Sequence, residues 1–199
     1  MKICIYGAAS NEIDKEYLDK VQLLGEKMAQ RGHSLVFGGG ANGCMGASAR
    51  GCHKYGGEII GIAPTFFNVD GVLFEHCTKL IRTETMRERK KLLEEYSDAF
   101  VISPGGVGTM DEFFEIITLK QLGRHNKAVV FYNVKGYYDE LCRFLDKMIG
   151  EKFAGKKLKE LFKFFDSADE LLDYLENYEP METDVASVRN ITLDEEKKK

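Results

Sequence analysis

The chain has 199 residues, of which 44% are hydrophobic and 11% aromatic, enough to bury one sizeable core. Lys and Arg total 28 against 32 for Asp and Glu, so the net charge of −4 predicts no general attraction to nucleic acid or to anionic membranes. The five cysteines form an odd set without a C-x-x-C pair, which favours reduced thiols over a disulfide framework. No apolar run approaches the ~20 residues that span a bilayer, and the N-terminal run is too short for a signal peptide, so we expect a cytoplasmic protein.

Short apolar runs rich in β-branched residues alternate along the chain with longer segments of helical period. Strands are predicted over residues 2–6, 34–37, 59–63, 79–82, 99–103, 128–132 and 162–165. Helices are predicted over residues 11–31, 43–55, 85–96, 109–122, 137–149 and 168–176. This alternation predicts an α/β protein with a Rossmann-like, doubly wound parallel sheet of about seven strands and helices on both faces.

We expect a single domain over residues 1–180, because nothing in that range marks a linker, a repeat or a low-complexity block. Residues 181–199 are polar and weakly periodic, which predicts a mobile tail. In the helix predicted over 137–149, one apolar stripe is interpreted as core; it comprises Tyr137, Leu141, Phe144, Leu145 and Met148.

Two glycine-rich segments follow predicted strands, at the sheet edge where open parallel sheets bind ligands. One is Gly38-Gly39-Gly40, and the other runs from Pro104 to Glu112 with the sequence PGGVGTMDE. Glycines let the backbone approach an anion closely, and the helix that follows offers its positive end to the same anion. Neither segment is a dinucleotide fingerprint or a P-loop, so a phosphate of some other nucleotide is the first ligand to consider.

Two charged groups near these loops each have a structural and a functional interpretation. Arg89 and Lys90 could belong to a solvated helix face balanced by glutamates, or they could bind an anion, because their helix would open at the same rim. Glu112 could close a capping box with Thr109, or it could be a catalytic acid.

An adjacent pair of possible metal ligands, such as Cys52-His53 or His76-Cys77, lacks zinc-site spacing, so no metal and no cofactor is expected.

At these positions the chain resembles the LOG (Lonely guy) family of cytokinin riboside 5′-monophosphate phosphoribohydrolases, long mislabelled as lysine decarboxylases. The resemblance covers roughly residues 1–178. The hallmark P-G-G-x-G-T-x-x-E is intact from Pro104 to Glu112, and the preceding R-K pair is Arg89-Lys90. Another match is N-x-x-G-Y-Y, which begins at Asn133.

The resemblance implies hydrolysis of the N-glycosidic bond of adenosine 5′-monophosphates, including N6-modified ones, with release of free base and ribose 5-phosphate. Arg89 and Glu112 would be catalytic. Further residues would contact or line the nucleotide site: Lys90, Gly105, Gly106, Val107, Gly108, Thr109, Met110, Asp111, Thr118, Gly38, Gly39, Gly40 and Ser10. The family also implies a homodimer with the site at the subunit interface.

A second hypothesis is a non-catalytic carrier of a nucleotide or of the molybdenum cofactor on the same fold. Proteins of that kind resemble this group but lack its full motif, so the intact Arg89 and Glu112 argue for the hydrolase. Decarboxylation with pyridoxal phosphate would need a Schiff-base lysine, and no lysine here lies in a recognisable motif.

Overall fold

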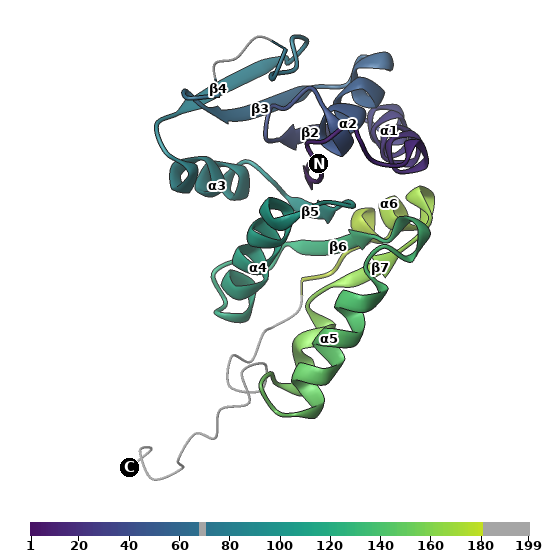
Figure 1. Ribbon diagram of the computed structural model, residues 1–199, viewed down its shortest axis with the longest axis vertical. Coiled ribbons are helices and arrows are strands. Elements are labelled where there is room, and N and C mark those ends of the chain that lie inside the picture. The colour runs from purple at the N-terminus through teal and green to yellow at the C-terminus, as the bar shows by residue number, and fades with distance from the viewer. Residues whose placement is uncertain (68–70, 181–199) are drawn as a thin grey trace.

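The computed structural model describes residues 1–67 and 71–180. Within these residues, seven strands form one all-parallel sheet in the order β4-β3-β2-β1-β5-β6-β7 (Figure 1). The strands are β1 (Lys2–Tyr6), β2 (Ser34–Phe37), β3 (Ile59–Pro64), β4 (Lys79–Thr83), β5 (Ala99–Ile102), β6 (Ala128–Tyr132) and β7 (Lys163–Phe165). The chain builds outward from β1 to β4, then crosses to the other side of β1 and builds outward again, so the predicted doubly wound parallel sheet is confirmed.

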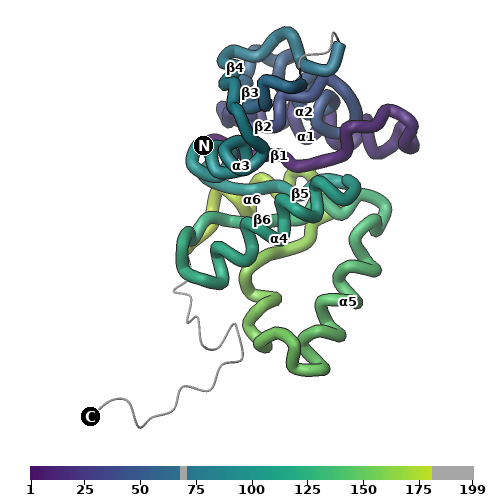
Figure 2. The backbone as a smooth tube through the Cα atoms, turned by 60° about the vertical axis from the view of Figure 1, so that its left-hand side comes forward, coloured from purple at the N-terminus to yellow at the C-terminus, as the bar shows by residue number. Residues whose placement is uncertain are grey.

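Helices cover both faces of the sheet. One face packs against α1 (Lys15–Gln30), α2 (Gly43–Lys54) and α6 (Ala168–Glu176), and the other against α3 (Met86–Glu95), α4 (Val107–Gln121) and α5 (Asp139–Gly150). Two short 3-10 helices, η1 (Val134–Gly136) and η2 (Lys156–Glu160), flank α5. Figure 2 shows the chain from β1 to β4 in the upper half and the β5 to β7 part in the lower half, meeting where β1 and β5 pair.

The strand sequences explain this two-layered core. Side chains alternate along β1, so that Ile3 and Ile5 enter the core beneath α1 and α2, while Cys4 and Tyr6 enter the core beneath α3 and α4. Both faces are buried, which is why the central strands read as continuous apolar runs.

In the part of the chain that is described, no helix is both long and apolar enough to cross a bilayer. The tail predicted over 181–199 lies outside the described residues.

The start of α4 differs from the sequence-based prediction. The helix begins at Val107, and its N-cap is Gly106 in an extended conformation with no side-chain hydrogen bond to the cap. Thr109 is therefore the third helical residue and Glu112 the sixth, and the first turn holds no acid. The predicted capping box was wrong, because the side chain of Thr109 lies against Gly105 instead of accepting a hydrogen bond from the backbone of a first turn.

The apolar stripe predicted as core on α5 is only partly buried. Leu145 is buried, and Leu141 and Met148 are partly buried and pack against the core. Phe144 is 56% exposed and Tyr137, which precedes the helix, is 45% exposed, so the prediction was wrong for these two. Phe144 lies about 100° around the helix axis from Leu145, on the flank of a helix that packs on one side only.

Candidate functional site

The site lies where the order of the strands reverses, at the carboxyl ends of the neighbouring strands β1 and β5. Ligands of open α/β sheets bind at this position. The loops that leave the two strands are tied together, because the N–H of Ala8 donates to the carbonyl of Pro104 at 3.0 Å. The hydroxyl of Ser103 donates to the carbonyl of Tyr6 at 2.8 Å. The glycine-rich loop after β5 is therefore anchored to the first strand.

The N-terminus of α4 presents free backbone donors at this edge. Among residues 1–67 and 71–180, no hydrogen bond uses the N–H groups of Gly106, Val107, Gly108 or Thr109. Gly106, Val107 and Gly108 are exposed to solvent. A side chain at Gly105 is excluded, since a Cβ there would lie 2.1 Å from the hydroxyl oxygen of Thr109. Free N–H groups and the positive end of a helix dipole together favour an anion.

Helix α3 delivers two basic side chains to the same edge. It begins directly after β4, and its N-cap is Thr85, whose hydroxyl accepts a hydrogen bond from the N–H of Glu88 at 3.1 Å. Arg89 and Lys90 follow within the first two turns, on the side of α3 that faces α4. The helix start thus fixes where both cations lie.

Arg89 and Glu112 form a buried ion pair between α3 and α4. The Nη1 atom of Arg89 lies 3.0 Å from Oε1 of Glu112, and its Nε donates to the carbonyl of Ile62 at 3.2 Å. The two residues are 5% and 8% exposed. A Cβ at Gly38 would lie 2.0 Å from Nη2 of Arg89, so a side chain there would displace the guanidinium. The structure thereby brings Arg89, Glu112 and Gly38 together.

The environment of Glu112 shifts its ionisation into the neutral range. Burial raises the pKa of Glu112 to about 7, and the nearby positive charge of Arg89 opposes that shift. Tyr6, at the end of β1, lines the same narrow crevice as Glu112, and its own pKa is raised, chiefly by burial. A carboxyl group with a pKa near 7 can both take up and release a proton at physiological pH, as a general acid or base must.

Lys90 lines the same crevice as Glu112 and joins α3 to α4 by a second set of contacts. Its Nζ lies 3.0 Å from Oδ2 of Asp111 and also pairs with Glu115. The hydrogen bond with Glu115 raises the pKa of Lys90, which keeps the amine charged. Glu115 was not among the predicted site residues, because an acid three residues after Glu112 carries no motif of its own.

Other predicted residues surround a cavity on the opposite side of the glycine-rich loop. The cavity has a volume of about 330 Å³, and its lining includes Ser10, Tyr17, Gly105, Gly106 and Tyr137. Ser10 is exposed and its hydroxyl accepts a hydrogen bond from the N–H of Glu12 at 3.1 Å. The structure therefore places Ser10 beside Gly105 and Gly106.

Gly39 and Gly40 have structural contacts of their own. Gly39 adopts a left-handed φ of 79° and packs against Ala63 and Leu73. Gly40 forms an isolated antiparallel bridge with Leu73. Met110 is half-buried and packs into the core on the α3–α4 face, so its side chain serves packing in this chain.

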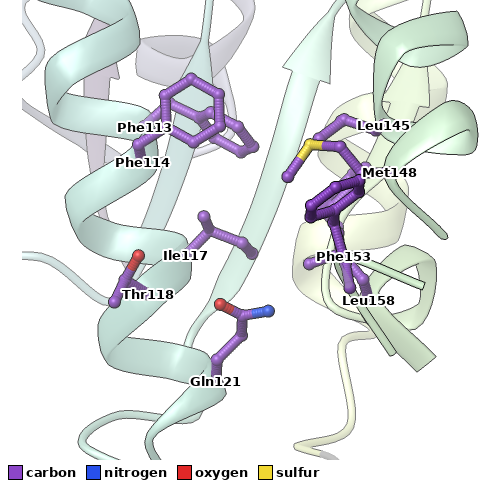
Figure 3. A pocket seen from close by; sticks show the side chains of 11 residues that line it. Phe113, Phe114, Ile117, Thr118, Gln121, Leu145, Met148, Phe153 and Leu158 are labelled. Carbon is purple, nitrogen blue, oxygen red and sulfur yellow. The ribbon is translucent and has the colours of Figure 1, made fainter. Parts of the chain in front are cut away.

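Thr118 does not join the other predicted residues within one chain. It lies six residues beyond Glu112 on α4, which places it about 240° around the helix axis on the exposed side. It lines a cavity of about 300 Å³ between α4 and α5, together with Phe114, Ile117 and Met148 (Figure 3). Most residues that line this cavity are apolar, and neither Arg89 nor Glu112 is among them.

Two tyrosines that sequence reasoning did not assign to the site also contact its loop. The hydroxyl of Tyr137 donates to the carbonyl of Gly105 at 2.8 Å, and that of Tyr138 donates to the carbonyl of Ser103 at 2.7 Å. The N-x-x-G-Y-Y match at Asn133 was the available signal, but the sequence does not reveal what these hydroxyls touch.

Among the described residues, no group of three or more His, Cys, Asp or Glu side chains could hold a metal ion. The two histidines of the candidate Cys-His pairs, His53 and His76, stack face to face with ring centroids 4.5 Å apart. Stacked rings direct their nitrogen atoms along the ring planes and not towards a common point between the rings, so this contact is a packing interaction.

Comparison with known proteins supplies the family. A family model described as possible lysine decarboxylase matches residues 45–175. Two cytokinin riboside 5′-monophosphate phosphoribohydrolases of Arabidopsis thaliana, LOG2 and LOG3, are 34% and 36% identical to this chain over 186 residues. Those alignments cover 94% of this chain and 87% and 86% of the two relatives.

Solved structures share the fold at lower identity. The molybdenum cofactor binding protein of Rippkaea orientalis matches with a TM-score of 0.66 and 19% identity, over 88% of this chain and 93% of that one. The molybdenum cofactor carrier protein of Chlamydomonas reinhardtii matches with a TM-score of 0.67 and 19% identity, over 88% and 95%. At such identities the likeness shows the fold alone. The family model and the Arabidopsis relatives show that the chain belongs to the LOG family, whose older description is possible lysine decarboxylase.

Proposed function

We propose that this chain is a nucleoside 5′-monophosphate phosphoribohydrolase. It hydrolyses the N-glycosidic bond of adenosine 5′-monophosphate (AMP) or an N6-modified derivative and releases the free base and ribose 5-phosphate. The observation that carries the proposal is the buried Arg89–Glu112 pair beside the unpaired N–H groups of α4, in a chain 34–36% identical to the Arabidopsis enzymes.

The 5′-phosphate binds at the N-terminus of α4 in this proposal. The free N–H groups from Gly106 to Thr109 donate to the phosphate oxygens, and the helix dipole stabilises the negative charge. Lys90 exchanges one of its carboxylate partners, Asp111 or Glu115, for the nucleotide. The phosphate thereby fixes the ribose near the Arg89–Glu112 pair.

Glu112 then acts on the ribose. As the bond between C1′ and the base nitrogen breaks, the bonding electrons leave with the base, and C1′ and the ring oxygen share the positive charge of an oxocarbenium ion. The Glu112 carboxylate stabilises that charge and orients a water molecule, whose oxygen bonds to C1′. One proton of this water passes through Glu112 to the departing base. Arg89 holds the carboxylate in place.

We infer that two copies of the chain assemble with the exposed face of α4 at their interface. A stripe at helical spacing runs along this face and consists of Val107, Asp111, Phe114 and Thr118. Val107 is 88% exposed and Phe114 is 39% exposed, so this face of α4 presents apolar surface to a partner. A second copy packed on this stripe would cover both and bring its own Thr118 towards the site of the first.

The competing function is a carrier that binds a nucleotide or the molybdenum cofactor without cleaving it. Incubating the pure protein with AMP and with N6-isopentenyl-AMP, followed by chromatography of the free base, separates the two. Catalytic release of base from either nucleotide supports the hydrolase. Binding without release from either nucleotide, in a folded protein, supports the carrier.

A further inference from the structure

The turn between β6 and α5 is held in an unusual conformation. Lys135 and Gly136 both have left-handed backbones, with φ of 57° and 68°. The side chain of Asn133 fixes the turn, because its Oδ1 accepts from the N–H of Tyr138 at 2.7 Å and its Nδ2 donates to Asp139 at 2.8 Å. A left-handed lysine is strained, so the surrounding contacts must hold it. The turn therefore sets the position of the residue that follows it, Tyr137.

Tyr137 reaches from this turn to the glycine-rich loop after β5. Its hydroxyl donates to the carbonyl of Gly105 at 2.8 Å, and its ring packs edge-on against Tyr17 with ring centroids 5.7 Å apart. The carbonyl of the preceding residue, Pro104, accepts from the N–H of Ala8 at 3.0 Å. The carbonyls of Pro104 and Gly105 thus both accept hydrogen bonds from residues outside the loop.

The bond to Gly105 determines the direction of the next N–H group. The carbonyl of Gly105 and the N–H of Gly106 belong to one peptide unit, and in a planar trans peptide they point in opposite directions. Because the carbonyl points at Tyr137, the N–H of Gly106 points away from it. Glycine on both sides of a peptide leaves that unit free to rotate, since neither residue carries a side chain. Without the hydroxyl, the peptide could turn its carbonyl to the position that the N–H now holds.

We propose that Tyr137 is a positioning residue for the phosphate site: its hydroxyl holds the Gly105–Gly106 peptide with the N–H of Gly106 directed to the 5′-phosphate. This inference rests on the proposed function, because it assumes that the phosphate binds at α4. Tyr137 acts through the backbone and not by contact with the reacting atoms. It gives a role to the Asn133 to Tyr138 segment, which the proposed chemistry does not otherwise use.

The variant Tyr137→Phe removes the hydroxyl and keeps the ring that packs on Tyr17, so it is expected to fold. Without the hydroxyl, the Gly105–Gly106 peptide is free to rotate, and the N–H of Gly106 no longer stays directed at a charged phosphate oxygen. The Kd for ribose 5-phosphate therefore rises roughly tenfold. Ribose 5-phosphate carries the phosphate but no scissile bond, which makes it a binding probe independent of turnover. The KM for AMP rises by a similar factor, while kcat stays within about twofold.

The matched control is Tyr55→Phe. Tyr55 is 46% exposed at the end of α2, and within the described residues its hydroxyl makes no hydrogen bond. For this variant, the Kd for ribose 5-phosphate and the KM for AMP are expected to equal those of the wild type. Thermal unfolding of all three proteins accompanies the binding measurement, so that a loss of fold is distinguished from a loss of phosphate binding.

The outcomes separate this inference from the proposed function. If the wild type and Tyr137→Phe bind ribose 5-phosphate equally well, the inference is overturned while the hydrolase stands. If the wild type binds ribose 5-phosphate tenfold more tightly than the variant but releases no base, the hydrolase fails and the inference holds. A wild type that does not bind ribose 5-phosphate overturns the inference, and a fall in kcat at constant Kd does so as well.

Discussion

Arg89 on α3 and Glu112 on α4 are joined across 3.0 Å, and only 7% and 10% of their side chains are exposed. Removing two charges from water is costly, so a buried ion pair contributes little net stability compared with apolar residues of similar size. We therefore interpret this pair as serving the chemistry of the site.

Glu112→Gln is expected to abolish turnover without unfolding the protein. Glutamine has the same size and can still accept the hydrogen bond of Arg89, but it cannot carry the negative charge that stabilises an oxocarbenium ion. We expect kcat to fall by at least roughly 100-fold, measured as free base released from AMP. Circular dichroism should match the wild type, whereas the melting temperature should fall, because Arg89 keeps a buried charge without its anionic partner. Full activity in this variant would remove the proposed mechanism.

The control for this variant is Glu95→Gln, an acid near the end of α3 whose partner is Lys91 at 3.6 Å on the surface. Exposed pairs of this kind contribute about 0.3–0.5 kcal/mol, so neither stability nor kcat should change appreciably. Helix capping does not complicate the comparison, because the N-cap of α4 is Gly106 and Glu112 takes no part in it.

Activity is expected to rise with pH through about 7, the pKa to which burial raises Glu112. Glu112 must be ionised before substrate binds, and a raised pKa means that its protonated form dominates below that value. Values of kcat/KM should therefore increase about tenfold per pH unit in the acidic range and level off above neutrality. A profile that is flat from pH 5.5 to 8 would contradict this role for Glu112. The second ionisation of the substrate phosphate, near pH ~6, should appear as a separate break.

Gly38→Ala is expected to damage the site through Arg89. The new Cβ would lie 2.0 Å from Nη2 of Arg89, so the guanidinium must shift from the position in which its Nη1 contacts Glu112. Small displacements of a positioning group cost roughly 100-fold in rate, and we expect a fall in kcat of at least tenfold. Gly150→Ala is the control, because no atom lies within 4 Å of a Cβ there. Equal kinetics for both variants would show that the position of Arg89 is unimportant.

Phe114→Glu is expected to separate the two copies of the proposed dimer. Phe114 is 39% exposed in the stripe on α4, and a charge buried in an interface is strongly unfavourable. Light scattering after size exclusion should show a monomer, and base release should fall although the Arg89–Glu112 pair is unaltered. The control Tyr55→Glu changes an exposed aromatic residue at the end of α2, on the other face of the sheet. A wild type that is monomeric and fully active would rule out the shared site.

The sheet and most of its helices could be predicted from local patterns. Apolar runs such as those of β1 and β6 are buried on both faces, so strand and core can be read from the same residues. The start of α4 could not be predicted in this way, because Gly106, Val107 and Gly108 do not resemble a first helical turn. That turn is stabilised by the anchored loop behind it and not by its own side chains.

Motifs in the sequence suffice to propose residues for the site, but not their arrangement. The motifs indicated Arg89 and Glu112, yet their contact joins residues 23 positions apart on two helices. The hydroxyl of Tyr137 likewise reaches a carbonyl 32 residues away in the sequence. Thr118 belongs to the same motif-bearing helix, but the helical period turns it away from Glu112. Contacts of this kind depend on the crossing of elements, which no local pattern encodes.

The proposed hydrolysis can be tested directly by the stoichiometry of the products that the pure protein forms from AMP and from N6-isopentenyl-AMP. The hydrolase mechanism predicts that free base and ribose 5-phosphate appear in equal amounts from at least one nucleotide, that wild-type turnover is catalytic, and that Glu112→Gln forms both products at least roughly 100-fold more slowly. Absence of both products with the folded wild type would contradict it. Release of inorganic phosphate and the intact nucleoside would contradict it equally.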